Sequence, residues 1–437
     1  MKLRAYLLSL FYCLLLPLAI ARRRPSAASS AASNENTDND DMEDATASST
    51  TTTTKQHRRS PSSYLHEPTP TSRNSFQKSS NRLQSTAILD HHHEFNEDLS
   101  SKFSGEVLTY VTPWNRKGYA YAKLMASKIT WLVPVWFQIR QDANGTIYIA
   151  GEHDINHEWL NEMRAAAAAA ASSFELESYS CRSSGSSGDS RGDTGSSDHQ
   201  ECSSSTITTM KIVPRIALEM DATMANKRVA EIVQQLMLPL SKKGGFDGFT
   251  LEIPINHFGF IEKLAGAIKK SGLSALLAVP PIEIPSTDGP ERQVFQRLGT
   301  TVDRVSVMTY DFNNRVGGFP NAPIEWMRAV MKGLSSVDSL RGKLLLGLPM
   351  YGWRGTDAMT GDSMVLWLAS GRVDIIWEPT YQEHHFIDKR TQKQSSYPTI
   401  PFLARRLALA EEMSGSGVAG VALWELGQMM TYFVDGF

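Results

Sequence analysis

Short apolar, β-rich segments alternate with helical segments from Gly105 to the end of this 437-residue chain, and this alternation restricts the fold more than any other feature. We expect eight strands, at 107–111, 131–137, 211–216, 248–252, 275–279, 304–308, 344–347 and 420–423. Helical segments lie between most of them, at 119–127, 158–171, 224–241, 258–271, 291–298, 324–334 and 400–413. The strands are almost continuously apolar, as in strands that are covered on both faces. The pattern predicts an α/β fold, the (β/α)8 TIM barrel.

One of these strands carries a carboxylate that an apolar strand does not explain. Side chains alternate along a strand, so one face of the segment is apolar: Phe249, Leu251 and Ile253. Glu252 lies on the opposite face, near the end of the strand. Burying a carboxylate there is costly unless a cavity, a partner or a ligand receives it. Glu252 is therefore a candidate ligand-binding residue, although hydrogen bonds from Thr250 or Tyr310 to a purely structural Glu252 are an alternative.

Two low-complexity regions fall outside the barrel pattern. Residues 22–100 are rich in Ser, Thr, Asn and Asp and poor in apolar residues, so they cannot bury enough apolar surface to offset their ordering entropy. We expect a disordered tail there. Residues 165–206 begin with seven alanines that continue a helix and then become Ser-, Gly- and Asp-rich from Ser172. We expect the latter part to be a disordered insertion in a barrel domain of residues 101–437, since long surface loops add little closure entropy.

The first 21 residues resemble a secretory signal peptide. Lys2 and Arg4 precede an apolar run at 6–20, which is short for a membrane span, and Ala19-Ile20-Ala21 fits a cleavage site. The arginines at 22–24 are unfavourable for export, so a signal anchor is the alternative. We expect a secreted or endosomal–lysosomal protein with no stable membrane span.

Two further features depend on that compartment. Asn144-Gly145-Thr146 is an N-glycosylation sequon, and Asn-Gly also predicts a tight turn between two extended segments. Of the three cysteines, Cys13 lies in the signal segment. Cys181 and Cys202 either form a disulfide in an oxidising compartment or remain two thiols of a flexible insertion.

Charge and composition argue against two classes of function. The net charge of −2 provides no electrostatic basis for nucleic-acid binding. His91-His92-His93-Glu94 has metal-binding residue types, but adjacent histidines in a flexible tail are typical of weak, incidental sites. We expect neither a metal nor a cofactor.

Aromatic residues gather where the predicted strands end. They are Tyr110, Trp114, Trp136, Tyr310, Tyr351, Trp353 and Trp424. TIM barrels build their sites at the carboxyl ends of the strands. Aromatic rings bind the apolar C–H faces of sugars, while a few polar groups orient the hydroxyls. The cluster predicts a carbohydrate site, although Trp136 and Trp424 fit equally well as core residues.

Several short motifs, in this order and spacing, resemble glycoside hydrolase family 18. They are Val111-Thr112-Pro113-Trp114-Asn115, Pro134-Val135-Trp136, Phe246-Asp247-Gly248-Phe249, Val307-Met308-Thr309-Tyr310-Asp311, Asn321-Ala322-Pro323, Leu345-Leu346-Gly347-Leu348, Glu383-His384-His385-Phe386, Tyr397-Pro398-Thr399 and Trp424-Glu425-Leu426-Gly427-Gln428. The resemblance implies that Met308, Tyr310 and Asp311 line a sugar site. It also implies that Trp424 forms the aromatic floor of that site.

The resemblance also identifies a missing acid. Active members of the family have the strand pattern Asp-Gly-x-Asp-x-Asp-x-Glu, whose last Glu protonates the glycosidic oxygen while the preceding Asp orients the attacking acetamido group of the substrate. Here Thr250 replaces the first inner Asp, and Glu252 stands at the orienting position. Pro254 stands at the position of the acid and has no proton to donate. Glu252 is two residues away, roughly 6–7 Å along the strand, and general acid catalysis contributes about 10²–10⁴-fold.

The resulting expectation is a chitinase-like protein that binds a chito-oligosaccharide or related glycan without efficient hydrolysis. One alternative is a weak glycoside hydrolase that uses Glu252. The other is a protein-interaction module that binds a sorting receptor or a cell-surface protein. Resemblance of fold does not choose among them, because function depends on the site.

Overall fold

The computed structural model describes residues 85–95, 101–183, 209–284, 289–313 and 318–437. The predicted signal peptide at 1–21, most of the predicted tail, the insertion from 184 onward and Cys202 lie outside these residues. Cys181 lies in a helix of which only the backbone is described there, so the cysteine pairing stays a prediction. None of the described helices is both long and apolar enough to cross a lipid bilayer.

Parallel strands form a closed ring, which confirms the TIM barrel. The ring contains β1 (Glu106–Val111), β2 (Trp131–Pro134), β5 (Lys211–Ile212), β6 (Arg215–Leu218), β7 (Gly248–Glu252), β8 (Ser274–Val279), β9 (Arg304–Val307), β10 (Leu344–Pro349) and β16 (Val418–Trp424). β5 and β6 are successive parts of one extended segment. The first part pairs with β2 and the second with β7, while β16 pairs with both β10 and β1. These pairings join the two ends of the sheet.

The second barrel strand continues into a hairpin. β3 (Phe137–Gln141) pairs in parallel with β6 and antiparallel with β4 (Ile147–Ala150). Gly145 adopts a φ of 83° in the connecting turn, a conformation that glycine adopts at no steric cost. The predicted Asn-Gly hairpin is therefore confirmed.

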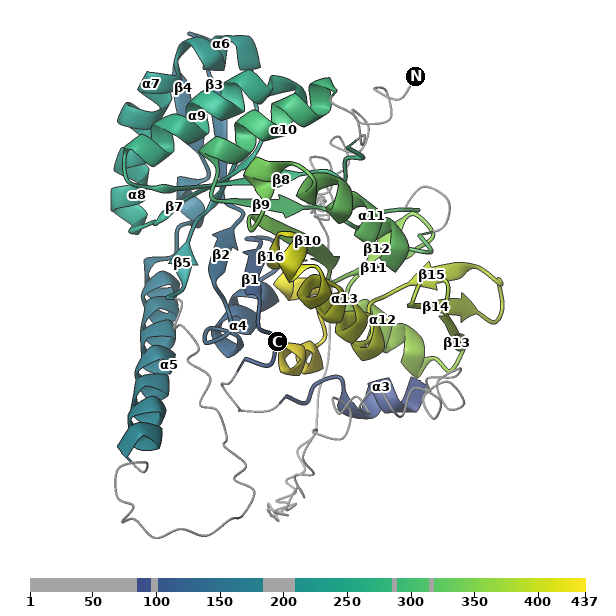
Figure 1. Ribbon diagram of the computed structural model, residues 1–437. Coiled ribbons are helices and arrows are strands. Elements are labelled where there is room, and N and C mark those ends of the chain that lie inside the picture. The colour runs from purple at the N-terminus through teal and green to yellow at the C-terminus, as the bar shows by residue number, and fades with distance from the viewer. Residues whose placement is uncertain (1–84, 96–100, 184–208, 285–288, 314–317) are drawn as a thin grey trace, which may run out of the picture. The chain divides into compact units, whose positions relative to one another are not determined.

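Helices cover the outside of the ring. They are α4 (Lys117–Leu124), α5 (His157–Ser183), α6 (Ala222–Lys227), α7 (Val229–Glu231), α8 (Leu238–Gly244), α9 (Phe258–Lys270), α10 (Pro290–Thr301), α11 (Ile324–Ser335) and α13 (Ile400–Glu412). α4 packs on β1, α9 on β8, α11 on β10 and α13 on β16 (Figure 1). Alternate strand residues face the other way and form a smaller core inside the barrel, which includes Leu108, Tyr110, Trp131, Val133 and Leu276.

A second sheet, which the sequence did not predict, lies between β10 and β16 in the chain. It contains β11 (Gly352–Arg354), β12 (Asp357–Met359), β13 (Val373–Glu378), β14 (Glu383–Asp388) and β15 (Gln394–Ser396), with α12 (Gly361–Ala369) between β12 and β13. Buried Glu383 accepts the backbone N–H groups of Asn321 and Ala322, at 3.0 and 2.7 Å. Arg406 of α13 donates to the Ala322 carbonyl at 2.6 Å and to the carbonyl of Gln382, next to β14, at 2.7 Å. These contacts fasten the second sheet to the barrel.

Two predicted boundaries of the low-complexity regions need correction. Within the expected tail, α3 (Ser85–His91) is a helix that packs against α12. Its Ile88 is 3% exposed, and the His92 carbonyl accepts the N–H of Tyr432 at 3.3 Å. Burial of Ile88 in this contact offsets the entropy lost on ordering the helix, although the average composition of residues 22–100 is too polar to do so. Helix α5 also continues past Ser172 to Ser183, into the expected insertion.

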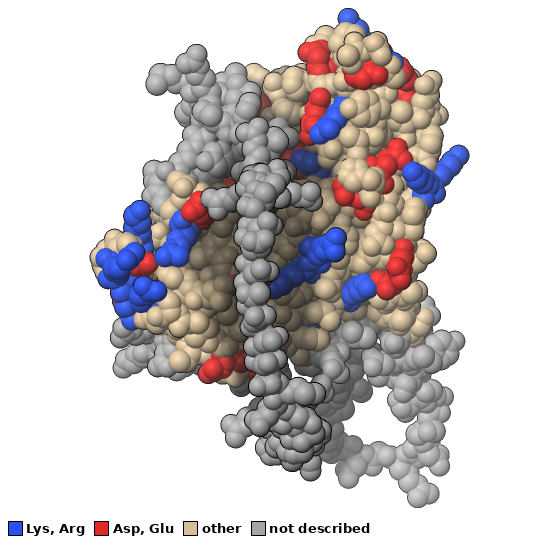
Figure 2. All heavy atoms as spheres, turned by 180° about the vertical axis from the view of Figure 1, so that it is seen from behind, with Lys and Arg blue, Asp and Glu red and all other residues tan. Residues whose placement is uncertain are grey.

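Acidic and basic side chains are intermixed on the face shown in Figure 2. This distribution agrees with the small net charge of −2.

Candidate functional site

Three of the predicted site residues meet where β1, β7 and β16 end. The rings of Tyr110 and Trp424 lie 5.1 Å apart and are tilted by 59°. Tyr110 is buried and hydrogen-bonds to Ser306 of β9; burial, and secondarily the nearby charge of Glu252, raises its pKa well above the ordinary value. Trp424 remains half-buried. We call this end of the barrel the mouth.

An arginine that the sequence analysis missed neutralises Glu252. Arg215 of β6 donates from Nε to Glu252 Oε2 at 2.8 Å and from an Nη to Oε1 at 2.9 Å, and the two side chains are only 9% and 11% exposed. Thr250, a partner considered from the sequence, instead donates its hydroxyl to the Val213 carbonyl at 3.0 Å. A charged residue inside an otherwise apolar strand was the available signal for Arg215. Both oxygens of Glu252 are therefore engaged by a guanidinium.

Pro254 lies two residues beyond the end of β7, and its contribution to the local structure is its backbone. Its carbonyl accepts the N–H of His257 at 2.9 Å, which begins a short 3-10 turn at Ile255–His257. The chain turns at the point where the family pattern requires an acid.

A second group of predicted residues surrounds Asp311 after β9. Asp311 is half-buried, with a φ of 64°, and its N–H donates to Asn321 Oδ1 at 3.0 Å. Its Oδ1 accepts from Trp353 Nε1 at 2.8 Å and from the Tyr351 hydroxyl. Burial raises the pKa of Asp311, whereas these two donors oppose the shift.

The aromatic residues differ in how much of each ring a ligand can reach. Tyr310, Tyr351 and Trp353 are buried, at 7%, 5% and 4% exposure; Tyr351 and Trp353 donate to Asp311, and the ring of Tyr310 packs edge-on against Tyr351. Trp114 and Phe312 are 47% and 45% exposed, and Met308 is half-buried. The sequence analysis missed Phe312, although an aromatic residue directly after a strand-end Tyr-Asp pair was a usable signal.

The structure contradicts the prediction that Trp136 binds a ligand. Trp136 is fully buried, its Nε1 donates to the Tyr119 hydroxyl at 2.8 Å, and its ring lies 6.1 Å from that of Phe246. Val133 and Val135 of the same segment face the inside of the barrel. Alternation therefore turns Trp136 outward, to the layer between the strands and the helices.

The remaining predicted sites are at the surface. Asn144 is exposed in the β3–β4 hairpin, where its N–H donates to Asp142 Oδ1 at 2.9 Å. His91 Nδ1 pairs with Glu94 Oε2 at 2.9 Å, and His92 Nδ1 contacts the Leu89 carbonyl. Within the described ranges, no group of three or more His, Cys, Asp or Glu residues is placed to hold a metal ion.

A second buried carboxylate links the first and last barrel strands at the mouth. Glu425, next to Trp424, is 1% exposed. It accepts from Asn115 Nδ2 at 2.8 Å and from the N–H of Gly427 at 3.0 Å. Asn115 follows Trp114, so Glu425 ties the loop after β1 to the end of β16. Burial raises the pKa of Glu425 from 4.5 to about 7, against the opposing effect of the two donors.

This shift predicts a specific pH dependence of stability. Between pH 4.5 and 7 the unfolded chain loses the Glu425 proton while the folded chain keeps it. The free energy of unfolding should therefore fall with rising pH over this range, by up to roughly 3 kcal/mol from this group. Glu425→Gln does not titrate and should lack this component. Urea unfolding of both proteins from pH 4.5 to 7.5 measures the difference; parallel stability curves would contradict the assignment.

Comparison with known proteins agrees with this architecture. No family model matches the chain. The spore cortex-lytic enzyme SleL of Bacillus cereus is similar in structure, with 16% identity and a TM-score of 0.54 over 77% of this chain and 74% of that chain. A chitinase from Chromobacterium violaceum has 16% identity and a TM-score of 0.54 over 76% and 97%. A class V chitinase mutant from Cycas revoluta, in complex with (GlcNAc)3, has 12% identity and a TM-score of 0.53 over 76% and 98%. The chain therefore has the TIM-barrel fold of these chitinases and of SleL.

Proposed function

We propose that this protein is a chitinase-like protein of the secretory pathway that binds a chito-oligosaccharide or a related glycan at the barrel mouth without hydrolysing it efficiently. The observation that carries the proposal is the loss of the acid after β7 and the pairing of the remaining glutamate. Pro254 occupies the position of the acid, and Arg215 holds both oxygens of Glu252. A proton donor for the glycosidic oxygen is therefore lacking at the position where the family pattern places one.

Binding is supported by the surfaces that remain open. Half-buried Trp424 is backed by Tyr110, and Trp114 and Phe312 are exposed at the ends of other strands. Such rings stack on sugar C–H faces, and half-buried Asp311 supplies a carboxylate for hydroxyl groups. The (GlcNAc)3 complex of the Cycas chitinase makes a chito-oligosaccharide the first ligand to test.

We also propose that the chain is most similar to chitinase domain-containing protein 1 within the family. The resemblance is the single glutamate on this strand together with the absence of an acid at the last position. A full-length alignment that places the chain nearer to active members would contradict this proposal. Weak hydrolysis by Glu252 is less favoured, since the carboxyl group would have to leave Arg215 before donating a proton.

The missing acid predicts that hydrolysis is at background level. Wild type and Glu252→Gln should release reducing ends from chitotetraose equally slowly, because losing a general acid costs about 10²–10⁴-fold. Faster release by wild type would instead support the hydrolase. Glu252→Gln leaves Arg215 without its carboxylate, so Arg215→Met/Glu252→Met is the matched variant, in which both charges are removed together. Circular dichroism establishes that each variant is folded.

The open face of Trp424 predicts where the glycan stacks. Trp424→Ala should weaken chitotetraose binding at the mouth at least tenfold, equivalent to about 1.4 kcal/mol, in isothermal titration calorimetry. Trp377→Ala is the matched control, because Trp377 lies on β13 at the edge of the second sheet. No saturable binding by wild type, or unchanged binding by Trp424→Ala, would contradict a glycan site at Trp424.

Passage through the secretory pathway predicts a glycan at Asn144, whose side chain is exposed in the hairpin. Protein from mammalian cells should lose apparent mass on treatment with peptide N-glycosidase, whereas Asn144→Gln should not change. Equal migration of the treated and untreated wild type would contradict the proposal.

A further inference from the structure

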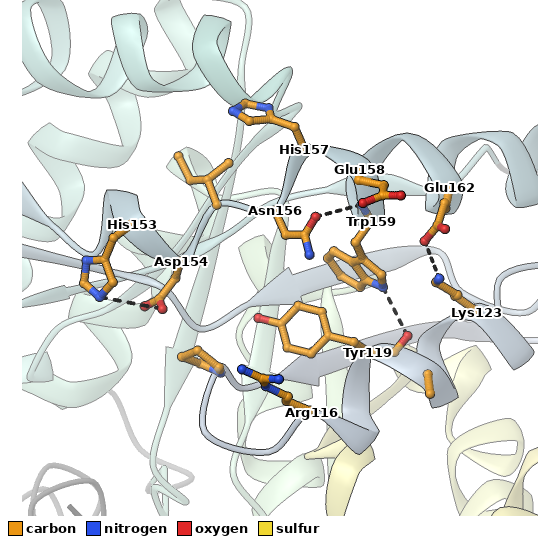
Figure 3. Close-up of a pocket in the computed structure, with 13 residues that line it drawn as sticks. Arg116, Tyr119, Lys123, His153, Asp154, Asn156, His157, Glu158, Trp159 and Glu162 are labelled. Atoms are coloured by element: carbon orange, nitrogen blue, oxygen red, sulfur yellow. Dashed lines mark hydrogen bonds and ion pairs between the residues drawn. The ribbon is translucent and has the colours of Figure 1, made fainter.

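A cavity of about 870 Å³ lies between helix α4 and the start of α5, and its lining residues Pro113 and Arg116 flank Trp114 and Asn115 of the mouth in the chain (Figure 3). We call it the α4–α5 groove. Residues 113–123 form one wall and residues 153–162 form the other. We infer that this groove is a second carbohydrate site, which binds an uncharged oligosaccharide; its ligand class rests on the proposed function. Its volume falls within the roughly 300–1,000 Å³ of ligand sites.

The aromatic wall of the groove is held rigidly by hydrogen bonds. The ring of Tyr119 packs edge-to-face on Trp159 at 4.6 Å, and Trp159 Nε1 donates to the Tyr119 carbonyl at 3.1 Å. The Tyr119 hydroxyl accepts from Trp136 Nε1 at 2.8 Å and retains its own proton, because burial raises the pKa of Tyr119 to about 12. Half-buried Tyr119 thus presents both a ring and a hydroxyl group to a ligand.

A constrained turn places the polar wall opposite. Gly151 has a φ of 98°, and a Cβ at this position would lie 1.9 Å from the Trp136 carbonyl oxygen. The turn that follows places Asp154 in the wall of the groove, and the Asp154 N–H donates to the Gly151 carbonyl at 3.0 Å. Asn156 Oδ1 accepts the N–H of Trp159 at 3.0 Å, while its amide nitrogen points toward Tyr119 in Figure 3. Carboxylate and amide groups are therefore directed into the groove.

The charges of the groove favour a neutral ligand. Lys123 forms an ion pair with Glu162, and His153 lies 3.7 Å from Asp154. Exposed Arg116 and Glu158 add one charge of each sign. Three carboxylates, at Asp154, Glu158 and Glu162, outnumber the cations Arg116 and Lys123, so the lining disfavours an anionic ligand; because these charges largely cancel, it gains little from a cationic one. Sugar hydroxyls both donate and accept, so they match the alternating acceptors and donors of this lining.

Hydrogen exchange with mass spectrometry separates this site from the mouth. Saturating chitotetraose should slow amide exchange in peptides spanning 116–123 and 151–162, and separately in peptides spanning 308–313 and 424–428. Arg116→Ala/Asp154→Asn should lose the protection of the groove only, with at least tenfold weaker binding there. Trp424→Ala should lose the protection of the mouth only. Arg116 is exposed and Asp154→Asn is isosteric, so both changes should leave the fold intact; Arg372→Ala, at another exposed arginine, is the matched control.

The possible patterns of protection distinguish the two proposals. Protection of both regions, or of the groove alone, supports the inference, and groove protection alone contradicts glycan binding at the mouth. Protection of the mouth alone overturns the inference and leaves the proposed function standing. Protection of neither region overturns both. A sulfated tetrasaccharide should bind the groove more weakly than chitotetraose, and tighter binding of the sulfated sugar would overturn the assignment to an uncharged ligand.

Discussion

Closure of the parallel strands into a ring is the constraint on which the rest of the structure depends. In a closed ring, alternate side chains must face either the narrow interior or the layer of helices. This rule sends Tyr110 and Glu252 inward and Trp136 outward, even though all three lie at or near strand ends. The position of a residue along a strand therefore brings it near the mouth. Whether its side chain faces the interior or the helices then decides whether a ligand can reach it.

The interior of the barrel is stabilised by a charge pair at a place where apolar packing is otherwise the rule. Removing two charges from water is costly, and their attraction offsets this cost only when the geometry and hydrogen bonding are good. The bidentate contact between Arg215 and Glu252 meets that condition. The same contact accounts for a glutamate on the inner face of β7 without assigning it a catalytic role.

Most of the barrel was predictable because its signals are local. The strand 248–252 was predicted with its observed bounds, and α9 was predicted to within one residue at its end. The partner of Glu252 was not predictable, since Arg215 is distant in sequence and meets it only through strand pairing. The second sheet was missed because strands such as β11 and β12 are too short to show a period. Trp136 was misassigned because its place at the strand end was weighed above the alternation that faces Val133 and Val135 inward.

The buried arginine also makes the loss of the acid difficult to reverse. A glutamate restored at position 254 would lie just beyond the end of β7, where the chain enters the 3-10 turn at Ile255–His257. Glu252, which stands at the orienting position, would still be held by Arg215 through both oxygens and would not be available to orient the acetamido group of a substrate. Regaining hydrolysis would thus require coordinated changes on β6 and β7. A variant that carries only one of these changes would gain no advantage in catalysis.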